Sequence, residues 1–395
     1  MILLADKKLC TGCGACAFQC SRSCIKMESD TIGQIYPIID TAFCIECHAC
    51  EKICPVLNEP ETYLPQRAYA AWSLDPQQRA TSASGGIAYE LYRYAIANAY
   101  KVVGASFNDD LSVSLKIAST CEEIMPFKNS KYVFSEAYSV YPQIREGLKR
   151  GEKFMLVGVS CQIAAMRKLF DKYENVIYVE ILCHGMTPFS YLRQHVDAIE
   201  NKTGKKSCSM TFRAPEAHTN TYTLILYDAE GNSFYVARTK DGDAYQFGYH
   251  RSVSYRENCY HCSFAKRERV GDIILCDFYG LGKTMSFEYD KNEVSCILTT
   301  TFKGKTFIDQ IIASDRIFAE ERPIEEAVDG NPRLRQSNRK TDDRREFESR
   351  IAQFDGDFEQ AIAPLVTSYI KALEMPFWKK RLYSLKNRIL ELISS

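Results

Sequence analysis

The cysteines are the residues of this chain best suited to chemistry, and eight of them form a repeat near the amino terminus. The segments CTGCGACAFQC and CIECHACEKIC both have the spacing C-x2-C-x2-C-x3-C, and each cysteine of the first recurs 34 residues later in the second. This spacing binds three thiolates to one [4Fe-4S] cluster and sends the fourth to a neighbouring cluster. We therefore predict one cluster bound by Cys10, Cys13, Cys16 and Cys54, and another bound by Cys44, Cys47, Cys50 and Cys20.

Residues 1–60 are thus predicted to be a bacterial-type ferredoxin domain with two clusters. Gly12 and Gly14 would let the backbone fold closely over a cluster and direct N–H groups at its sulfur atoms. The alternative is structural zinc, whose sites use pairs of cysteines and not a triplet followed by a fourth. Pro60 and Pro65 mark the linker that follows.

Four further cysteines, although distant in sequence, can meet at one sheet edge. Cys161 follows the apolar run EKFMLVGVS and Cys183 follows NVIYVEIL, with a predicted helix between them. The two strands of such a βαβ unit end on the same edge, where adjacent chains lie about 4.8 Å apart. If the loop with Cys259 and Cys262 folds over this edge, a third [4Fe-4S] cluster is bound. The alternatives are inert buried cysteines and a zinc knuckle completed by Cys276 or His261.

The pattern after residue 66 alternates between helical and strand periodicity. Residues 85–99 place apolar side chains on one helical face, and 101–107 is a short apolar strand. We therefore predict an α/β fold, α+β overall, in which the ferredoxin domain is fused to a larger α/β domain. The predicted divisions are 1–60, 66–150, a part with the third cluster at 151–345, and a helical tail at 346–395.

Composition narrows the cellular setting. Lys plus Arg and Asp plus Glu each number 50, so the overall charge does not favour nucleic acid as a partner. Seventeen cysteines with no export signal favour thiolate ligands and a cytoplasmic location, where thiols stay reduced. Four of the five cysteines outside the predicted clusters are expected to be small core residues, namely Cys24, Cys121, Cys208 and Cys296.

Five blocks of the body occur in a characteristic order: SASGG (82–86), NSKYVFS (129–135), GVSCQIAAMRK (158–168), ILCHGMTP (181–188) and NCYHCSFAKRERVGDIILCDFYG (258–280). Over roughly residues 66–345 the chain thereby resembles the beta-subunit family of coenzyme F420 hydrogenases and dehydrogenases, which includes plant 7-hydroxymethyl chlorophyll a reductase. The resemblance implies that the larger domain is an α/β flavin and iron–sulfur domain, with FAD on a flavin side at 66–150 and a [4Fe-4S] cluster on Cys161, Cys183, Cys259 and Cys262. The sequence departs from the family at Val159 and Ser160, usually Thr-Pro, at Cys276, usually Gly, and at Tyr279, usually Trp.

Several residues also suit a flavin on chemical grounds. Ser84, Gly85 and Gly86 precede a predicted helix, where backbone N–H groups and the helix dipole favour a pyrophosphate, although Gly-Gly before a helix is also ordinary turn chemistry. Lys131 is a candidate counter-charge. The family blocks add four cofactor-binding candidates, Ser130, Tyr132, Gly158 and Ser160.

The combination of iron–sulfur clusters and a flavin predicts a protein that converts between one-electron and hydride transfer, because clusters carry single electrons and a flavin exchanges them for a hydride equivalent. We expect a ferredoxin or similar redox protein to exchange electrons with the amino-terminal clusters, and the flavin site to reduce or oxidise a small organic or deazaflavin-like molecule. His184 and Cys276 are candidates for proton delivery. The alternatives are an electron-transfer subunit of a larger complex, linked in some members to surface-polysaccharide biosynthesis, and a scaffold without flavin.

The last residues carry an amphipathic stripe of Trp378, Leu382, Leu385, Ile389 and Leu392, flanked by lysines and arginines. Such a helix packs on protein or lies on a membrane surface. Peripheral membrane contact through this helix is therefore the second of two predictions.

Overall fold

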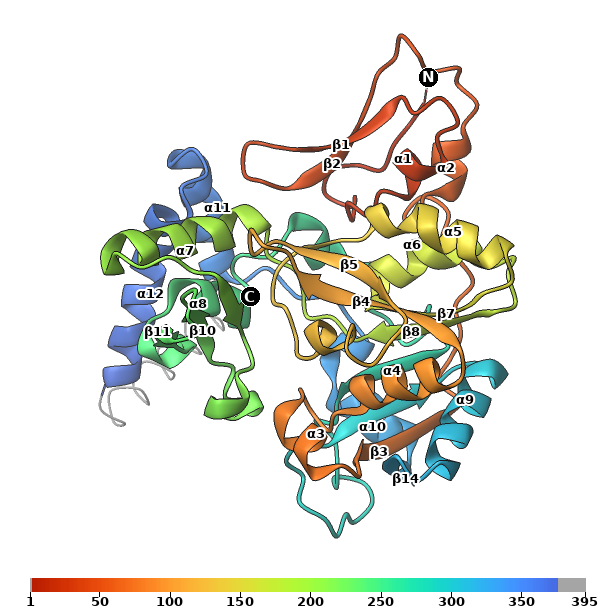
Figure 1. Ribbon diagram of the computed structural model, residues 1–395. Helices are drawn as coiled ribbons and strands as arrows, with labels where there is room; N and C mark the ends of the chain where they lie inside the picture. The colour runs from red at the N-terminus through yellow and green to blue at the C-terminus, as the bar shows by residue number, and fades with distance from the viewer. Residues whose placement is uncertain (1, 376–395) are drawn as a thin grey trace, which may run out of the picture.

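The computed structural model describes residues 2–375, and one mixed sheet of nine strands runs through the body (Figure 1). The predicted α/β fold is confirmed. The strands across the sheet are, in order, β14 (Ile317–Arg322), β3 (Arg67–Ser73), β13 (Ser295–Thr299), β12 (Ile273–Asp277), β8 (Val176–Ile181), β7 (Lys153–Val159), β4 (Tyr100–Phe107), β5 (Val113–Ala118) and β6 (Ser135–Glu136). Because β3 lies between β14 and β13, the predicted segments 66–150 and 151–345 build one layer together.

The predicted βαβ unit is present at the centre of this sheet. β7 and β8 are parallel neighbours with Val159 opposite Ile181, and α6 (Ser160–Phe170) connects them. Cys161 lies in the first turn of α6, and Cys183 lies two residues beyond β8. β12 continues the parallel run beside β8 and β4 continues it beside β7, so four strands bring their carboxyl ends to one edge.

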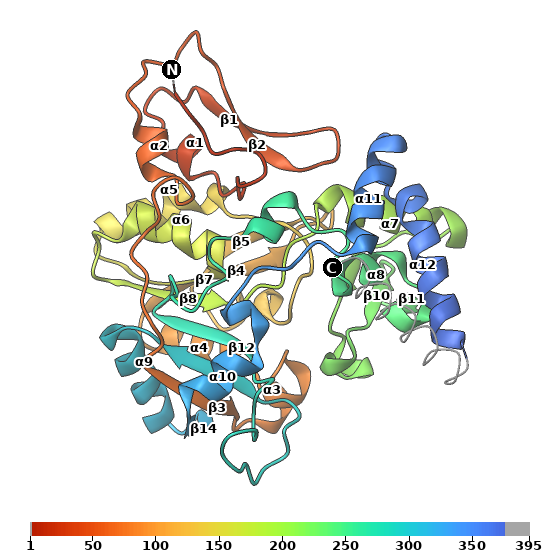
Figure 2. The same ribbon diagram turned by 180° about the vertical axis from the view of Figure 1, so that it is seen from behind.

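Helices cover both faces of the sheet, since the strands bury apolar side chains on each side. α4 (Ile87–Ala97) and α9 (Phe302–Ala313) cover one face. α5 (Tyr141–Lys149) and α6 cover the other, and Figure 2 shows α10 (Ile324–Gly330) on the sheet beside β12 and β3. The short α3 (Pro76–Thr81) precedes α4 and begins at Asp75, whose carboxylate accepts hydrogen bonds from two backbone N–H groups.

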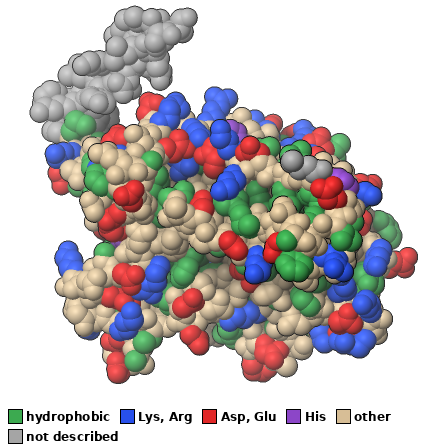
Figure 3. All heavy atoms as spheres, turned by 90° about the horizontal axis from the view of Figure 1, so that it is seen from above, with side chains coloured by type: hydrophobic (Ala, Val, Ile, Leu, Met, Phe, Trp, Pro, Cys, Tyr) green, Lys and Arg blue, Asp and Glu red, His purple; other side chains and the backbone are tan. Residues whose placement is uncertain are grey.

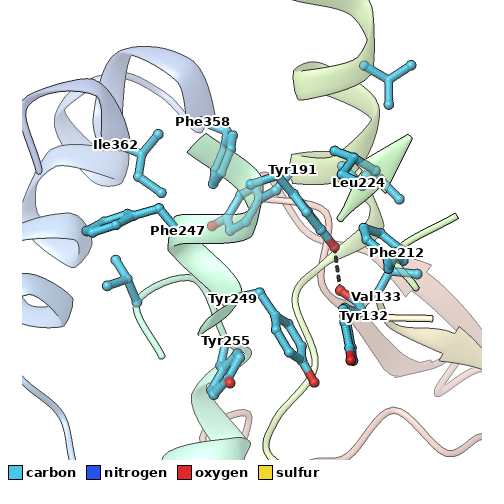
Figure 4. Packing of buried hydrophobic residues seen from close by; sticks show 14 of the residues in the cluster. Tyr132, Val133, Tyr191, Phe212, Leu224, Phe247, Tyr249, Tyr255, Phe358 and Ile362 are labelled. Atoms are coloured by element: carbon cyan, nitrogen blue, oxygen red, sulfur yellow. Dashed lines mark hydrogen bonds between the residues drawn. The ribbon is translucent and has the colours of Figure 1, made fainter. Parts of the chain in front are cut away.

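A smaller lobe lies beside the sheet and has its own core. It consists of α7 (Phe189–Thr203), β9 (Ser209–Thr211), β10 (Leu224–Tyr227), β11 (Ser233–Ala237), α8 (Ala244–His250), α11 (Asp342–Gln353) and α12 (Phe358–Glu374). Aromatic side chains from several of these elements converge in Figure 4, where the rings of Tyr191 and Phe358 stack with centroids 5.1 Å apart. The Tyr245 hydroxyl donates to the Tyr132 carbonyl at 2.7 Å, which joins this core to the body.

The amino-terminal segment lies on the α5 and α6 side of the body (Figure 1). It contains α1 (Ala15–Gln19), β1 (Ile25–Ser29), β2 (Ile35–Ile39) and α2 (Ala49–Ile53). Phe18 packs against Tyr141 and Phe170, with ring centroids 5.5 and 6.5 Å apart, respectively. The Tyr141 hydroxyl donates to the Cys13 carbonyl at 2.9 Å, so the segment is docked by both apolar and polar contacts.

The burial of four cysteines outside the predicted clusters tests the prediction that they are core residues. Cys24 and Cys296 are buried, as predicted, whereas Cys121 and Cys208 are exposed and the core prediction for them was wrong. Both lie outside the helices and strands, where no periodicity was available to place them.

Among residues 2–375, no helix combines the length and apolar character needed to cross a bilayer. The amphipathic stripe at 378–392 lies outside the described residues.

Candidate functional site

The structure brings together the first cysteine set, as its spacing predicts. Cys10, Cys13, Cys16 and Cys54 line a cavity of about 20 Å³, with Cys54 arriving from the other half of the repeat. Burial raises the pKa of Cys13 to about 11, and burial together with neighbouring thiols raises the pKa of Cys16. A bare thiolate is unfavourable there, whereas metal coordination holds a thiol deprotonated. The donor set therefore fits an iron–sulfur cluster.

The second set is more open. Cys20, Cys44 and Cys50 pack in one group, while Cys47 is exposed at its outer side. Cys24 was missed as a member of this group: its Sγ lies 3.4 Å from that of Cys20. The signal was present in the sequence as CSRSC, four residues past a predicted ligand, but no spacing rule assigns it a role.

Left-handed backbone at equivalent points of the repeat forms the tight turns over the thiols. Gly12 and Gly14 have φ of +69° and +71°, and their counterparts Glu46 and His48 have φ of +50° and +57°. In the first half a side chain would also collide: a Cβ at Gly14 would lie 2.5 Å from the Tyr138 side chain. In the second half, Glu46 and His48 are exposed.

The third set assembles as predicted at the edge of the large sheet. Cys161, Cys183, Cys259 and Cys262 line one cavity of about 30 Å³. Cys259 belongs to a short 3-10 helix at Glu257–His261, which is folded back over the edge. Two backbone N–H groups donate to the sulfurs: Gly185 to Cys183 at 3.3 Å and Met186 to Cys259 at 3.4 Å. Such N–H to sulfur bonds are what a cluster's thiolate ligands use.

Burial also dominates the electrostatics of the third set. It raises the pKa of Cys259 to about 11, and it raises that of Cys161 well above the usual range, with Cys262, Cys183 and Cys259 adding to the rise. Within residues 2–375, no three or more His, Cys, Asp or Glu side chains have an arrangement that would hold a single metal ion. A [4Fe-4S] cluster is larger than a single ion, because its four ligands bind at the corners of a four-iron cluster.

A buried ion pair holds the loop of the third set in place. Arg269 pairs with Glu180, which lies near the end of β8 and three residues before Cys183. Ser160, predicted to bind the cofactor, donates to the same carboxylate at 2.7 Å and lines the cysteine cavity. Its placement therefore associates Ser160 with the third cysteine set.

A larger cavity, of about 350 Å³, adjoins the third set. It lies at the carboxyl ends of β7, β8 and β12 and is closed on the other side by aromatic residues of the smaller lobe. The segment Leu182–Met186 lines both this cavity and the cysteine cavity. Most of the predicted cofactor and proton-delivery residues line it, namely Ser84, Gly86, Ser130, Lys131, Tyr132, Gly158, His184 and Cys276. The carboxyl edge is where ligands bind in open α/β sheets.

Gly85 does not line the large cavity. Its N–H donates to the Ser295 hydroxyl at 2.9 Å, and a Cβ there would lie 2.6 Å from the Ala71 carbonyl oxygen. The residue therefore allows close packing of the chain against β3. Gly86, with φ of +79°, precedes the first turn of α4, and the Ser84 hydroxyl donates to the Asp277 carboxylate.

Lys131 lines the large cavity but its ammonium group is already engaged. Nζ donates to the carbonyls of Pro126 and Lys128, both at 2.7 Å, and burial lowers the pKa of Lys131 to about 7. Arg213 is a cation that the sequence analysis missed. Its Nη1 donates to the Tyr132 hydroxyl at 3.1 Å, while its Nε is buried without a hydrogen-bond partner. No motif surrounds Arg213 in the sequence, so only the fold reveals it.

The two proton-delivery candidates have different surroundings. Burial lowers the pKa of His184, which keeps its imidazole neutral at neutral pH, and its ring lies 6.4 Å from that of Tyr279. Cys276 lies opposite Cys296 across β12 and β13, and it contributes to raising the pKa of that buried thiol. Both candidates line the large cavity.

Comparison with known proteins identifies the segment that builds the third set. Residues 151–325 match the family model that describes the carboxyl-terminal part of the coenzyme F420 hydrogenase/dehydrogenase beta subunit. Over this segment the chain is similar to that family. The matched segment holds β7, α6, β8 and all four cysteines of the third set, and the F420 hydrogenase/dehydrogenase resemblance predicted from sequence is confirmed there.

Two individual proteins extend the comparison. A subunit of the F(420)H(2) dehydrogenase of Methanosarcina mazei is 24% identical over 273 residues, which is 64% of this chain and 71% of that protein. A chain in the xenon-derivatised F420-reducing [NiFe] hydrogenase complex from Methanosarcina barkeri is 18% identical with a TM-score of 0.44, covering 75% of this chain and 95% of that one. The Methanosarcina mazei protein is thus a component of an oxidoreductase.

Proposed function

We propose that this protein is an iron–sulfur flavoprotein oxidoreductase, with three [4Fe-4S] clusters and FAD in the large cavity. The observation that best supports it is the shared wall formed by Leu182–Met186 between that cavity and the third cysteine set. When bound, the clusters supply single-electron transfer and the flavin supplies its conversion to a hydride equivalent. The predicted divisions at 1–60, 66–150, 151–345 and 346–395 are retained in this proposal.

The three cysteine sets adjoin one another in series. Cys16 of the first set packs in the same group as Cys20 and Cys44 of the second. Cys13 of the first set packs in the same buried core as Cys161 of the third. The sets therefore form a path that starts at the second set, passes through the first and third sets, and ends at the large cavity. This path leads from the exposed Cys47 to the interior of the protein.

The large cavity has the character of a cofactor site. Its volume of about 350 Å³ is in the range of small-molecule sites, which are mostly apolar with a few placed polar groups. Tyr89, Tyr249 and Tyr255 supply aromatic surface. Arg213 supplies a guanidinium whose free Nε suits a phosphate oxygen. Ser84 and Gly86 present backbone at the start of α4, where the helix dipole favours an anion.

The substrate is proposed to be a small organic or deazaflavin-like molecule, as the names of the family and of the similar Methanosarcina mazei protein suggest. Within the large cavity, the neutral His184 imidazole is suited to accept a proton and Cys276 to donate one. Electron flow in either direction is compatible with these roles.

A redox protein such as a ferredoxin is the proposed partner at the second set. Figure 3 looks onto the side that carries the amino-terminal segment, where apolar side chains lie among charges of both signs. Phe43 and Ile45, which precede Cys47 in the chain, are 62% and 59% exposed, and Leu3, whose N–H donates to the Glu51 carboxylate, is 71% exposed. Small, partly apolar faces are typical of transient electron-transfer contacts.

The second candidate is an electron-transfer subunit that relays to a catalytic partner and has no substrate of its own. It is favoured by the same two names, because the family is described by a beta subunit and the Methanosarcina mazei protein is one subunit of a dehydrogenase. The two candidates differ in whether the isolated protein, given an artificial electron donor, turns over a deazaflavin or another small molecule.

Anaerobic purification followed by iron, zinc and flavin analysis tests the proposal. Three cubanes correspond to about 12 iron atoms per chain, accompanied by one flavin. Cys262→Ala should retain about 8 iron atoms, whereas Cys121→Ser, at an exposed cysteine outside the three sets, should leave the iron unchanged. Finding about 8 iron atoms plus zinc in the unaltered protein would contradict the third cluster, and finding no flavin would favour a scaffold.

A further inference from the structure

Arg256 lies between the amino-terminal segment and the body, and it is only 1% exposed. Its Nη2 donates to the Ile35 carbonyl, at the start of β2, at 3.1 Å. Its guanidinium lies over the rings of Phe134 and Tyr36, at 4.6 and 5.4 Å from their centroids. One side chain thus contacts both parts of the chain across their interface.

This guanidinium has no carboxylate partner among the described residues. Nε donates to the amide oxygen of Asn258 at 3.3 Å, and Nη1 is buried with no hydrogen-bond partner. The neighbouring carboxylate, Glu257, is already paired with Lys340 at 2.7 Å and with Arg344 at 3.3 Å. A buried charge left without a counter-ion is strongly unfavourable, so the structure requires an anion from another source.

The anions available on both sides of Arg256 are thiolates. On one side, a Cβ at Gly12 would lie 3.0 Å from Nη2, which places the guanidinium against the turn of the first set. On the other side, the backbone of Arg256 is fixed at the third set: its N–H donates to Met186, and its carbonyl accepts from the N–H of Cys259 at 3.0 Å. The guanidinium also reaches the third set through Asn258, whose amide oxygen accepts from Nε at 3.3 Å and which lines the cavity formed by the cysteines of that set.

We propose that Arg256 is a shared counter-ion of the first and third cysteine sets, and that its charge makes both clusters easier to reduce. The inference rests on the proposed function, since it requires clusters at both sets. A [4Fe-4S] cluster with four thiolates is an anion that gains a further negative charge on reduction, so a buried cation stabilises the reduced form more than the oxidised form. Arg256 is therefore a positioning residue for electron transfer between the two sets.

Redox titration followed by electron paramagnetic resonance, on the complete anaerobic protein, tests this role. Arg256→Gln keeps a donor for the Ile35 carbonyl but removes the charge, and Arg256→Lys keeps the charge. Lys7→Gln is the matched control, because the Lys7 ammonium lies 5.3 Å from the same Tyr36 ring but is exposed to solvent. We expect Arg256→Gln to shift the midpoints of both clusters to more negative potentials, with Arg256→Lys and Lys7→Gln close to the unaltered protein.

Each outcome decides the question. A shift of only one cluster in Arg256→Gln, or no shift at all, overturns the shared role. If Arg256→Gln fails to retain clusters while Arg256→Lys retains them at unaltered potentials, the charge is required and the proposal stands. If the Lys and Gln variants behave alike, the charge is not the determinant and the proposal fails. Iron and flavin content of the unaltered protein tests the proposed function separately.

Discussion

Arg269 and Glu180 form the buried ion pair beneath the third cysteine set, and breaking it is expected to be costly. Their side chains are 1% and 0% exposed. Arg269 also donates to the carbonyls of Phe264 and Lys266, at 2.9 and 2.6 Å, and thereby fixes the loop that follows Cys262. Glu180 accepts from Ser160 at 2.7 Å, beside Cys161. The pair therefore joins the two strand-end cysteines to the loop cysteines.

The magnitude follows from burial. Removing one partner of a buried pair leaves an uncompensated charge and typically costs about 3–5 kcal/mol. Glu180→Leu and Arg269→Met should each lower the free energy of unfolding by that order. The double variant removes both charges, so its loss should be smaller than the sum of the two single losses by about 2 kcal/mol or more.

Urea unfolding of the anaerobic protein, with iron retention measured in parallel, checks this prediction. The matched control is Arg267→Met, two residues away, whose partner Glu325 and own side chain are 56% and 43% exposed. Loss of such an exposed pair should cost no more than about 1 kcal/mol. The reasoning is refuted if Arg269→Met costs no more than Arg267→Met, or if the two buried substitutions are strictly additive.

Three further predictions concern other parts of the molecule. Cys183→Ser should lower the iron content from about 12 to about 8 atoms per chain and leave the amino-terminal clusters intact; unchanged iron would contradict its role as a ligand. Burial disfavours the charge on His195, but two carboxylates, including Asp243 at 3.0 Å, outweigh it and raise its pKa to about 10. Because this pKa lies above the usual value of 6.5, the charged His195 stabilises the folded state fully below about pH 6.5, and this contribution to the free energy of unfolding is lost as pH rises toward about 10. The urea midpoint of His195→Gln should therefore fall less between pH 6.5 and 9.5 than that of the unaltered protein, and an equal fall would refute the assignment. Gly14→Ala places a Cβ against Tyr138 at a left-handed φ of +71°, so proteolysis of the amino-terminal segment should become faster; an unaltered rate would show that the interface adapts.

The sequence predicted the positions of the three cysteine sets because each depends on spacing or on strand ends. Cysteine spacing alone assigned Cys54 to the first half of the repeat, and the end of a βαβ unit assigned Cys183 to the same edge as Cys161. These relations follow from backbone geometry, which short sequence patterns specify well.

Side-chain partners were not predictable in the same way. The Lys131 ammonium donates to backbone carbonyls of its own loop, and the Ser160 hydroxyl donates to Glu180 instead of facing the large cavity. Arg213 comes from an irregular segment that no motif marks. Such contacts depend on packing between elements far apart in the chain, for which one sequence supplies no periodic signal.

The equivalent turns in the two halves of the repeat differ in residue type according to whether they face the body or the solvent. At the two left-handed positions the inward half has Gly12 and Gly14, whereas the outward half has Glu46 and His48. Residues with side chains occupy these positions where the turn is exposed to water, and glycine occupies them where other residues pack against the turn. In this repeat, the residue types at these two positions therefore distinguish the half that packs against the body from the half whose turns are exposed to solvent.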